Sequence, residues 1–166
     1  MKIRELLEDK SDRISDFLDR WYSEHESIKS SEIEGMLKDF PQFSHSGYVE
    51  RWVGIPADVF VKNDLADGDD IDTEKTEEYI AEHEPNRYVS GCASDNGLSK
   101  FFNKGGLDSR DYNIVVGYEV KNGLYLKKMV GALANPNSHQ ELIAEVDEII
   151  FIPRHGEISS WQIPEK

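Results

Sequence analysis

The sequence predicts an α+β protein with two packed, mostly antiparallel sheets and an N-terminal helical lobe on one side. Apolar residues recur at helical spacing over residues 2–26, and short strand-like runs dominate after residue 48. The intervening helices are too few and too short for βαβ units. A chain of 166 residues is long enough for one such core. We therefore expect a helical lobe over residues 1–45 and a compact core over residues 46–166.

The composition limits the classes of partner. With 33 acidic and 19 basic residues, the net charge is -14, which repels phosphate backbones, so we expect nucleic acid to be an unlikely partner. The first ten residues, MKIRELLEDK, carry charges throughout and match neither a signal peptide nor a membrane-spanning helix. These observations predict a cytoplasmic protein without a membrane partner.

Cysteine and histidine usage predicts neither disulfides nor a metal site. Cys92 is the single cysteine of the chain, so an internal disulfide is impossible and a reducing compartment is favoured. The five histidines do not combine with cysteine at metal-ligand spacing.

The N-terminal lobe contains two predicted helices. The first covers residues 2–26, with a break near Ser11, where a second N-cap could form. The second begins with Ser31 as N-cap and Glu34 completing a capping box, and it ends at Phe40-Pro41.

Alternation over residues 48–53 predicts a strand with two different faces. Tyr48, Glu50 and Trp52 share one face, and Arg51 shares the other with two valines. An arginine on an apolar face is also explained by a salt bridge or by snorkelling to water.

The middle of the chain is strongly acidic. Residues 64–78 contain eight acids and one lysine, and the simplest interpretation is a mobile, solvated loop. A calcium loop is a weak alternative, because the acids lack EF-hand spacing. A short helix over residues 77–83 follows, and Pro85 stops it.

The second half alternates strands with short helices. We expect a strand at residues 87–91, a helix at 96–104, and a central strand at 111–120. Asn122-Gly123 is a strong turn signal, so residues 123–129 are expected to return as the second strand of a hairpin. A helical turn is expected at 139–145.

Three acids then lead directly into a buried strand. Glu145, Asp147 and Glu148 precede four apolar residues that Pro153 brings to an end. Glu148 is the last charge before the core, so a carboxylate is expected at the mouth of this strand.

Three features follow one another along the chain. They are an arginine on an early strand, a serine that ends a strand before a capped helix, and a glutamate that leads into a late strand. In this order they resemble the ADP-ribosyltransferases of the Arg-Ser-Glu class, especially the cholera- and pertussis-toxin-like and phage-encoded branches. Arg51, followed by Pro56-Ala57-Asp58, resembles the first motif. Tyr88-Val89-Ser90 with Phe101-Phe102 downstream resembles the second, and Glu148-Ile149-Ile150-Phe151 resembles the third.

The resemblance implies that a cleft between the sheets binds NAD as substrate and that ADP-ribose is transferred to a protein target. Glu148 would hold a ribose hydroxyl and stabilise the cation formed when nicotinamide leaves, and Ser90 would orient Glu148. Arg51 would bind phosphate or ribose, and His83 would contact the adenosine side. Phe101 would also line the NAD site. No metal is implied, and no Rossmann GxGxxG motif is present.

The sequence departs from the family pattern in two motifs, and the second departure concerns the acceptor. The second motif is Ser-Gly-Cys, which keeps only its first serine, and Val146 replaces the Glu or Gln found two residues before the catalytic glutamate. If the segment is extended, Val146 faces the acceptor, which predicts that guanidines are poor acceptors and that another protein side chain or water is used. If it is irregular, Glu145 or Asp147 takes the vacant place.

Two other functions remain open from the sequence alone. One is a degenerate relative that only binds or hydrolyses NAD. The other is a non-catalytic acidic inhibitor that covers a basic surface of its partner through charge complementarity.

Overall fold

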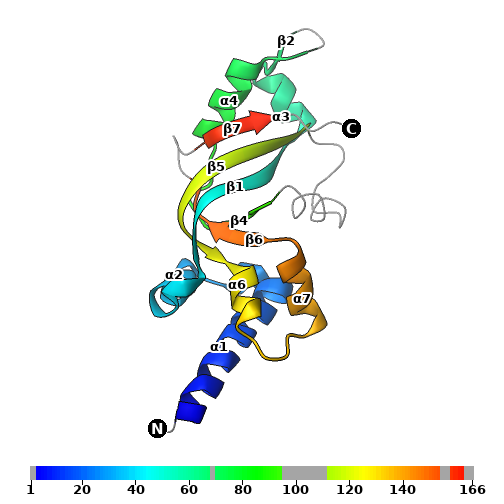
Figure 1. The fold of residues 1–166 in the computed structure, drawn as a ribbon. Coiled ribbons are helices and arrows are strands. Elements are labelled where there is room, and N and C mark those ends of the chain that lie inside the picture. The colour runs from blue at the N-terminus through cyan, green and yellow to red at the C-terminus, as the bar shows by residue number, and fades with distance from the viewer. Residues whose placement is uncertain (1–2, 68–69, 95–111, 154–157, 163–166) are drawn as a thin grey trace.

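A single antiparallel sheet forms the centre of the protein, which is described by a computed structural model (Figure 1). The described residues are 3–67, 70–94, 112–153 and 158–162. The strand order is β1-β4-β6-β5-β7, and β1 also pairs with β5, so the first four strands in this order close into a barrel. The prediction of two packed sheets is therefore wrong. The strands are β1 (Ser44–Ile55), β4 (Val89–Cys92), β5 (Tyr112–Tyr125), β6 (Glu148–Phe151) and β7 (Ile158–Gln162).

The length of β5 explains why one sheet replaces two. The predicted hairpin at Asn122-Gly123 is wrong, because β5 continues through both residues. Gly47 pairs with Val120 and His45 with Gly123, so β5 carries one extra residue here, which is a β-bulge. Asn122 adopts a left-handed φ of 62° within it. Most of β5 pairs with β1 and its end pairs with β6, so one strand closes the ring.

Two large apolar cores form among the described residues, on the two faces of these strands, and a small third cluster joins Cys92 and Val115. The first lies inside the ring, since each of its four strands contributes a residue to one buried cluster: Val49, Val89, Val116 and Ile149. Helices α3 (Ala57–Lys62) and α4 (Thr73–Glu82) add Phe60 and Ile80 to this core. A small ribbon of β2 (Ala66–Asp67) and β3 (Asp70–Ile71) lies at the same end of the molecule (Figure 1).

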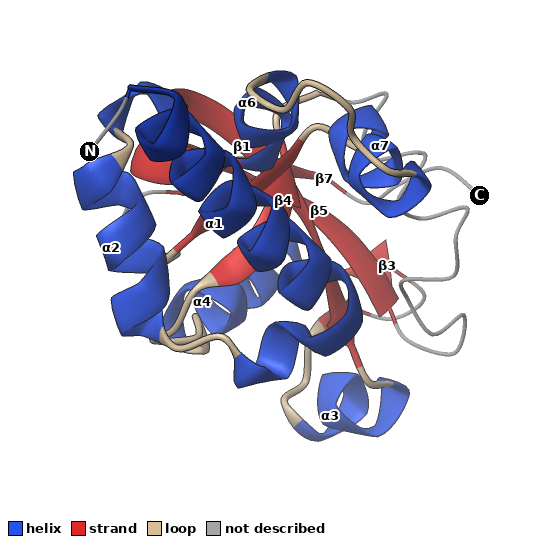
Figure 2. Ribbon diagram, turned by 90° about the horizontal axis from the view of Figure 1, so that it is seen from below, coloured by secondary structure: helices blue, strands red, loops and turns tan. Residues whose placement is uncertain are grey.

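The second core joins the N-terminal helices to the outer face of the sheet. Leu124 of β5 and Ile150 of β6 pack there with buried residues of four helices. Figure 2 shows α1 lying across the strands, with α2 and α7 on either side of it. The four helices are α1 (Ile3–Glu24), α2 (Ser30–Asp39), α6 (Leu126–Gly131) and α7 (Ser138–Glu145).

Several predicted element boundaries are corrected by local contacts. Helix α1 continues through Ser11, and α2 has Lys29 rather than Ser31 as its N-cap. The acidic segment predicted as a loop already enters α4 at Thr73, because the Asp72 side chain accepts a hydrogen bond from the Lys75 backbone at 3.1 Å.

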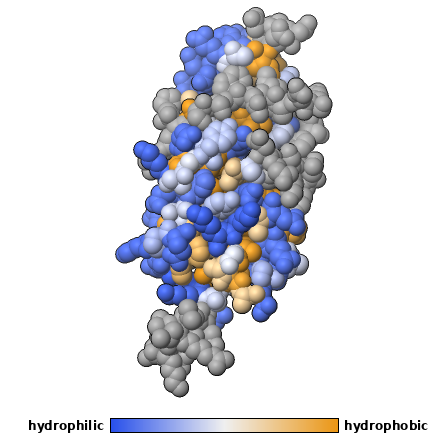
Figure 3. All heavy atoms as spheres, viewed as in Figure 1, coloured by the Kyte–Doolittle hydropathy of each residue, from blue (hydrophilic) through white to orange (hydrophobic). Residues whose placement is uncertain are grey.

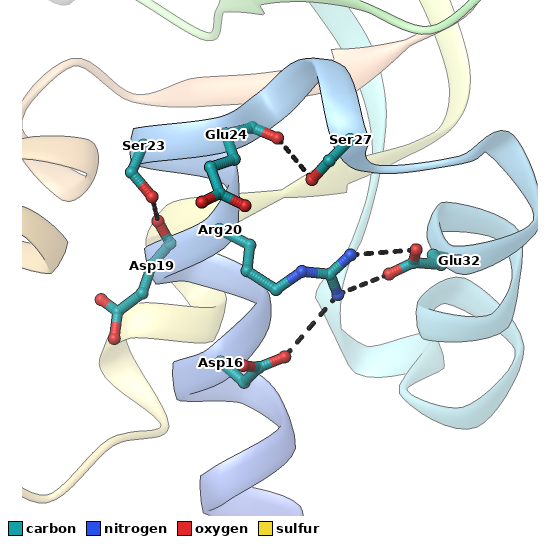
Figure 4. A network of polar contacts seen from close by, with 7 residues as sticks. All are labelled: Asp16, Asp19, Arg20, Ser23, Glu24, Ser27 and Glu32. Atoms are coloured by element: carbon teal, nitrogen blue, oxygen red, sulfur yellow. Dashed lines mark hydrogen bonds and ion pairs between the residues drawn. The ribbon is translucent and has the colours of Figure 1, made fainter.

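Polar contacts fix α1 against its neighbours (Figure 4). Arg20 donates two hydrogen bonds to the Glu32 carboxylate, at 2.7 and 3.0 Å, which joins α1 to α2. This fork lowers the pKa of Glu32. On the other side, the buried Gln140 of α7 donates to Ser15 at 2.8 Å and to Asp19 at 3.2 Å. Helix α1 is therefore held on both flanks.

Among the residues coloured by hydropathy in Figure 3, most of those on the visible face are hydrophilic, with smaller apolar areas between them. Among the described helices, none is long and apolar enough to cross a membrane.

Gly91 is required where β4 passes between β1 and β6. A β-carbon added there would lie 2.7 Å from Val49 Cγ1, 2.8 Å from Phe151 Cε1 and 2.9 Å from the Glu50 carbonyl oxygen. We expect Gly91→Ala to lower the free energy of unfolding by about 1–3 kcal/mol through overpacking. The matched control is Gly131→Ala, where no atom lies within 4 Å of the added methyl. Urea unfolding of both variants tests this, and equal stabilities would contradict the packing.

Candidate functional site

Glu148 is the first residue of β6 and follows a tight turn. Helix α7 begins with a capping box between Asn137 and Gln140 and ends at Glu145, with Val146 as its C-cap. Asp147 then turns the chain with a φ of 51°, and Glu148 opens the strand opposite Cys92 of β4. The predicted carboxylate at the mouth of a buried strand is confirmed.

Two hydrogen bonds hold the Glu148 carboxylate on one oxygen. Ser90 Oγ donates to Oε1 at 2.7 Å, and Trp21 Nε1 donates to the same atom at 2.9 Å. Ser90 comes from β4 and Trp21 from α1, so the contact joins three elements. Within the described chain, no hydrogen bond reaches Oε2. The carboxylate thus has a fixed orientation.

The pKa of Glu148 is set by opposing effects. Burial raises the pKa of this carboxyl group, and the opposing effects of Ser90, Trp21 and His25 only partly offset it. The folded chain therefore holds this proton more tightly than the unfolded chain does. The stability that the protonated group contributes is fully present below the pKa of an unfolded-chain glutamate and is lost as pH rises through the folded pKa.

A row of side chains crosses three strands beside this contact. Glu50 of β1 pairs with Cys92 of β4, and Cys92 pairs with Glu148 of β6, so all three lie on the outer face. Glu50 is only 7% exposed, and Tyr48 Oη donates to its Oε1 at 3.1 Å. Burial raises the pKa of the Cys92 thiol to about 12, with contributions from Glu148, Asp147 and Glu50.

Asp147 is occupied by contacts of its own. Its carboxylate accepts from Ser94 Oγ at 2.6 Å and Tyr125 Oη at 3.2 Å, and it forms an ion pair with Lys127 at 3.0 Å. Burial opposes ionisation, but Ser94, Lys127 and Tyr125 outweigh it and lower the pKa of Asp147. Asp147 is thereby held as a structural anion between β4 and β5.

Val146 does not take the position expected for an extended segment. It ends α7 in a turn, and only 7% of it is exposed, so it does not face an acceptor. The segment is irregular, but Asp147 is held by Ser94, Tyr125 and Lys127. Glu145 stays on the exposed side of α7.

Arg51 lies on the opposite side of β1 from Glu50, as the alternation predicted. It pairs with Val116, whose side chain belongs to the interior core, and it is close to Tyr118 and Glu84. Tyr118 Oη donates a hydrogen bond to Glu84 Oε1. Burial lowers the pKa of Arg51, while Tyr118 and Glu84 favour its charged form. Arg51 is thus a half-buried charged residue on the interior side of β1.

The predicted residues therefore form two pairs rather than one site. Ser90 and Glu148 meet on the outer face. Arg51 and His83 instead line a pocket of about 190 Å³ at the α4 end, where His83 stacks on Tyr79 with ring centroids 4.0 Å apart. The expectation that Arg51, Ser90 and Glu148 converge on one cleft is not met. Phe101 lies outside the described residues.

The sequence did not identify Trp21 and Tyr48 as residues of the site. Alternation did place Glu50 on the face opposite Arg51, but the sequence offered no way to bring that face next to Glu148. Trp21 appeared only as an apolar residue of a helix, because its indole N–H contact spans 127 positions of the chain.

Known proteins supply no assignment for this arrangement. Comparison with protein-family models, curated proteins and solved structures found no match. In the described ranges, no three His, Cys, Asp or Glu side chains are grouped so that they could hold a metal ion.

The raised pKa of Cys92 makes a chemical prediction. The thiolate is the reactive form, and Cys92 is only 2% exposed, so alkylation by iodoacetamide at pH 8 should be at least about a hundredfold slower in the folded protein than in urea. Mass spectrometry of the modified peptide gives both rates. Equal rates in the two states would show that the thiol is neither buried nor surrounded by carboxylates.

Proposed function

We propose that this protein is an NAD-dependent ADP-ribosyltransferase that cleaves the bond between nicotinamide and ribose and transfers ADP-ribose to a protein target. The observation that carries the proposal is the Glu148 carboxylate, held through Oε1 by Ser90 and Trp21. Ser90 and Glu148 are two of the three residues that the family resemblance assigned to catalysis, the third being Arg51. Their direct contact supports that assignment across 58 positions of sequence.

The chemistry requires one oriented carboxylate. Loss of nicotinamide leaves a positively charged, oxocarbenium-like ribose, which a fixed anion stabilises more than it stabilises the neutral sugar. Within the described residues Oε2 of Glu148 has no hydrogen-bond partner, so we expect it to accept a ribose hydroxyl or to face the cation. The hydrogen bonds from Ser90 and Trp21 favour the ionised carboxylate and prevent its rotation. The effect on ionisation and the effect on rotation are both present in the free protein, before the substrate reacts.

Arg51 and His83 stay outside this reaction centre. Their pocket opens on the interior side of β1, so the phosphate-binding role inferred for Arg51 has no support from its position relative to Glu148. The proposal therefore rests on Ser90 and Glu148. The net charge of -14 supports a protein acceptor or water over nucleic acid.

Nicotinamide release tests the proposal directly. The purified protein should release nicotinamide from NAD, and Glu148→Gln should lower the rate by about 10²–10³-fold, because a single electrostatic contact to a transition state has this effect. Gln keeps the acceptor for Ser90 and Trp21, so the fold should survive. Glu145→Gln, the same change at an exposed position, should leave the rate unaltered.

Two results would contradict the proposal. Absence of nicotinamide release from the natural protein would remove the enzymatic function and favour an acidic binding protein. Equal rates for Glu148→Gln and the natural protein would remove Glu148 from the reaction.

A further inference from the structure

We propose that a cavity between α2 and one end of the ring binds a small organic anion, namely a monocarboxylate with an apolar body. The cavity has a volume of about 370 Å³, which lies within the range of small-molecule sites. Neither Ser90 nor Glu148 lines it. The inference therefore adds a second binding site and does not depend on the proposed reaction.

Helix α2 forms one wall of the cavity. Glu34, Leu37 and Lys38 line it, and their spacing of three and four residues places them on one face of the helix. The same helix buries Ile33 and Met36 in the second core, which fixes its position. This wall presents one apolar and two charged residues to the cavity.

The β-bulge in β5 forms a second wall. Successive residues of a regular strand point to opposite faces, yet Val120, Lys121 and Asn122 all line this cavity. The bulge explains the difference, because Asn122 has its left-handed φ of 62° here and its backbone N–H donates to Ser46 Oγ at 3.2 Å. The irregular backbone thereby brings the exposed Lys121 to the same cavity as the buried Val120.

Apolar and aromatic residues complete the lining. Tyr88 directly precedes β4, and Phe151 and Ile152 lie at the end of β6. With Leu37 and Val120 they give the cavity an apolar surface beside its charged residues. Covering apolar surface is favourable, so a ligand with an apolar body gains from this site. Inorganic phosphate or sulfate would leave that surface uncovered.

Lys38 and Lys121 give the cavity a positive charge in a strongly acidic protein. In the part of the chain that the structure describes, neither lysine side chain forms an ion pair. Two lysines and the one glutamate, Glu34, leave a single positive charge, whereas the whole chain carries -14. This balance favours a ligand with one negative charge, and a carboxylate accepts charge-assisted hydrogen bonds from lysine.

The cavity is separated from the contact at Glu148. Glu148 opens β6 and Phe151 ends it, so at about 3.3 Å per residue their Cα atoms lie roughly 10 Å apart. Binding in the cavity can therefore be measured without NAD, and its result is independent of nicotinamide release.

Titration with octanoate, followed by ¹H–¹⁵N NMR, tests the proposal. Octanoate combines one carboxylate with an apolar chain and should bind with a Kd of about 10 mM or lower. The largest shifts should occur at the backbone amides of Lys121 and Asn122. Octanamide and octylammonium have the same chain length without the negative charge. They should bind at least about tenfold more weakly, because they cannot accept the charge-assisted hydrogen bonds.

Three variants at exposed positions separate a local effect from the charge of the whole protein. Lys121→Gln should raise the Kd for octanoate by about three- to tenfold, since one charged donor is lost. The matched control is Lys62→Gln, the same change on α3, which lies at the opposite end of the molecule from α2 (Figure 1). This control should leave the Kd unchanged. Glu34→Gln should lower the Kd, because it removes the negative charge from the cavity.

Four results would overturn the proposal. They are the absence of octanoate binding up to about 10 mM, shifts centred away from Lys121 and Asn122, octanamide or octylammonium binding as tightly as octanoate, and equal effects of Lys121→Gln and Lys62→Gln.

Discussion

The contact among Ser90, Trp21 and Glu148 is the interaction on which the proposed chemistry depends. It joins the sheet to the N-terminal helix, because one carboxylate oxygen accepts from a neighbouring strand at 2.7 Å and from α1 at 2.9 Å. A buried carboxylate without donors would cost far more free energy than a paired one. The placement of α1, secured by Arg20 and Gln140, is therefore part of the site rather than an accessory to it.

Closure of the ring is the constraint that positions these groups. Strand β5 pairs with both β1 and β6, so the two strands on either side of β4 are fixed and β4 is enclosed between them. Gly91 permits the close approach that results. Residues from β1, β4 and β6 consequently share a register in which Glu50, Cys92 and Glu148 face the same way. The opposite face holds Arg51 in the interior.

Local patterns in the sequence predicted the strands better than their assembly. Alternation correctly separated Glu50 from Arg51, and the acidic approach to an apolar run correctly placed Glu148 at the start of a strand. The hairpin predicted at Asn122-Gly123 was wrong because a bulge and a hairpin turn both favour residues that tolerate positive φ. Which faces meet depends on long-range pairing, to which local periodicity is insensitive.

The most direct measurement is a pH titration of the Trp21 indole N–H by ¹H–¹⁵N NMR. The signal is assigned with Trp21→Phe. It should shift with a midpoint above the roughly 4.3 of an ordinary glutamate, since burial raises the pKa of Glu148 and the indole donates to its carboxylate. The shift should vanish in Glu148→Gln. A Trp21 signal that does not titrate, or that titrates at the ordinary value in both proteins, would contradict the contact at the centre of this account.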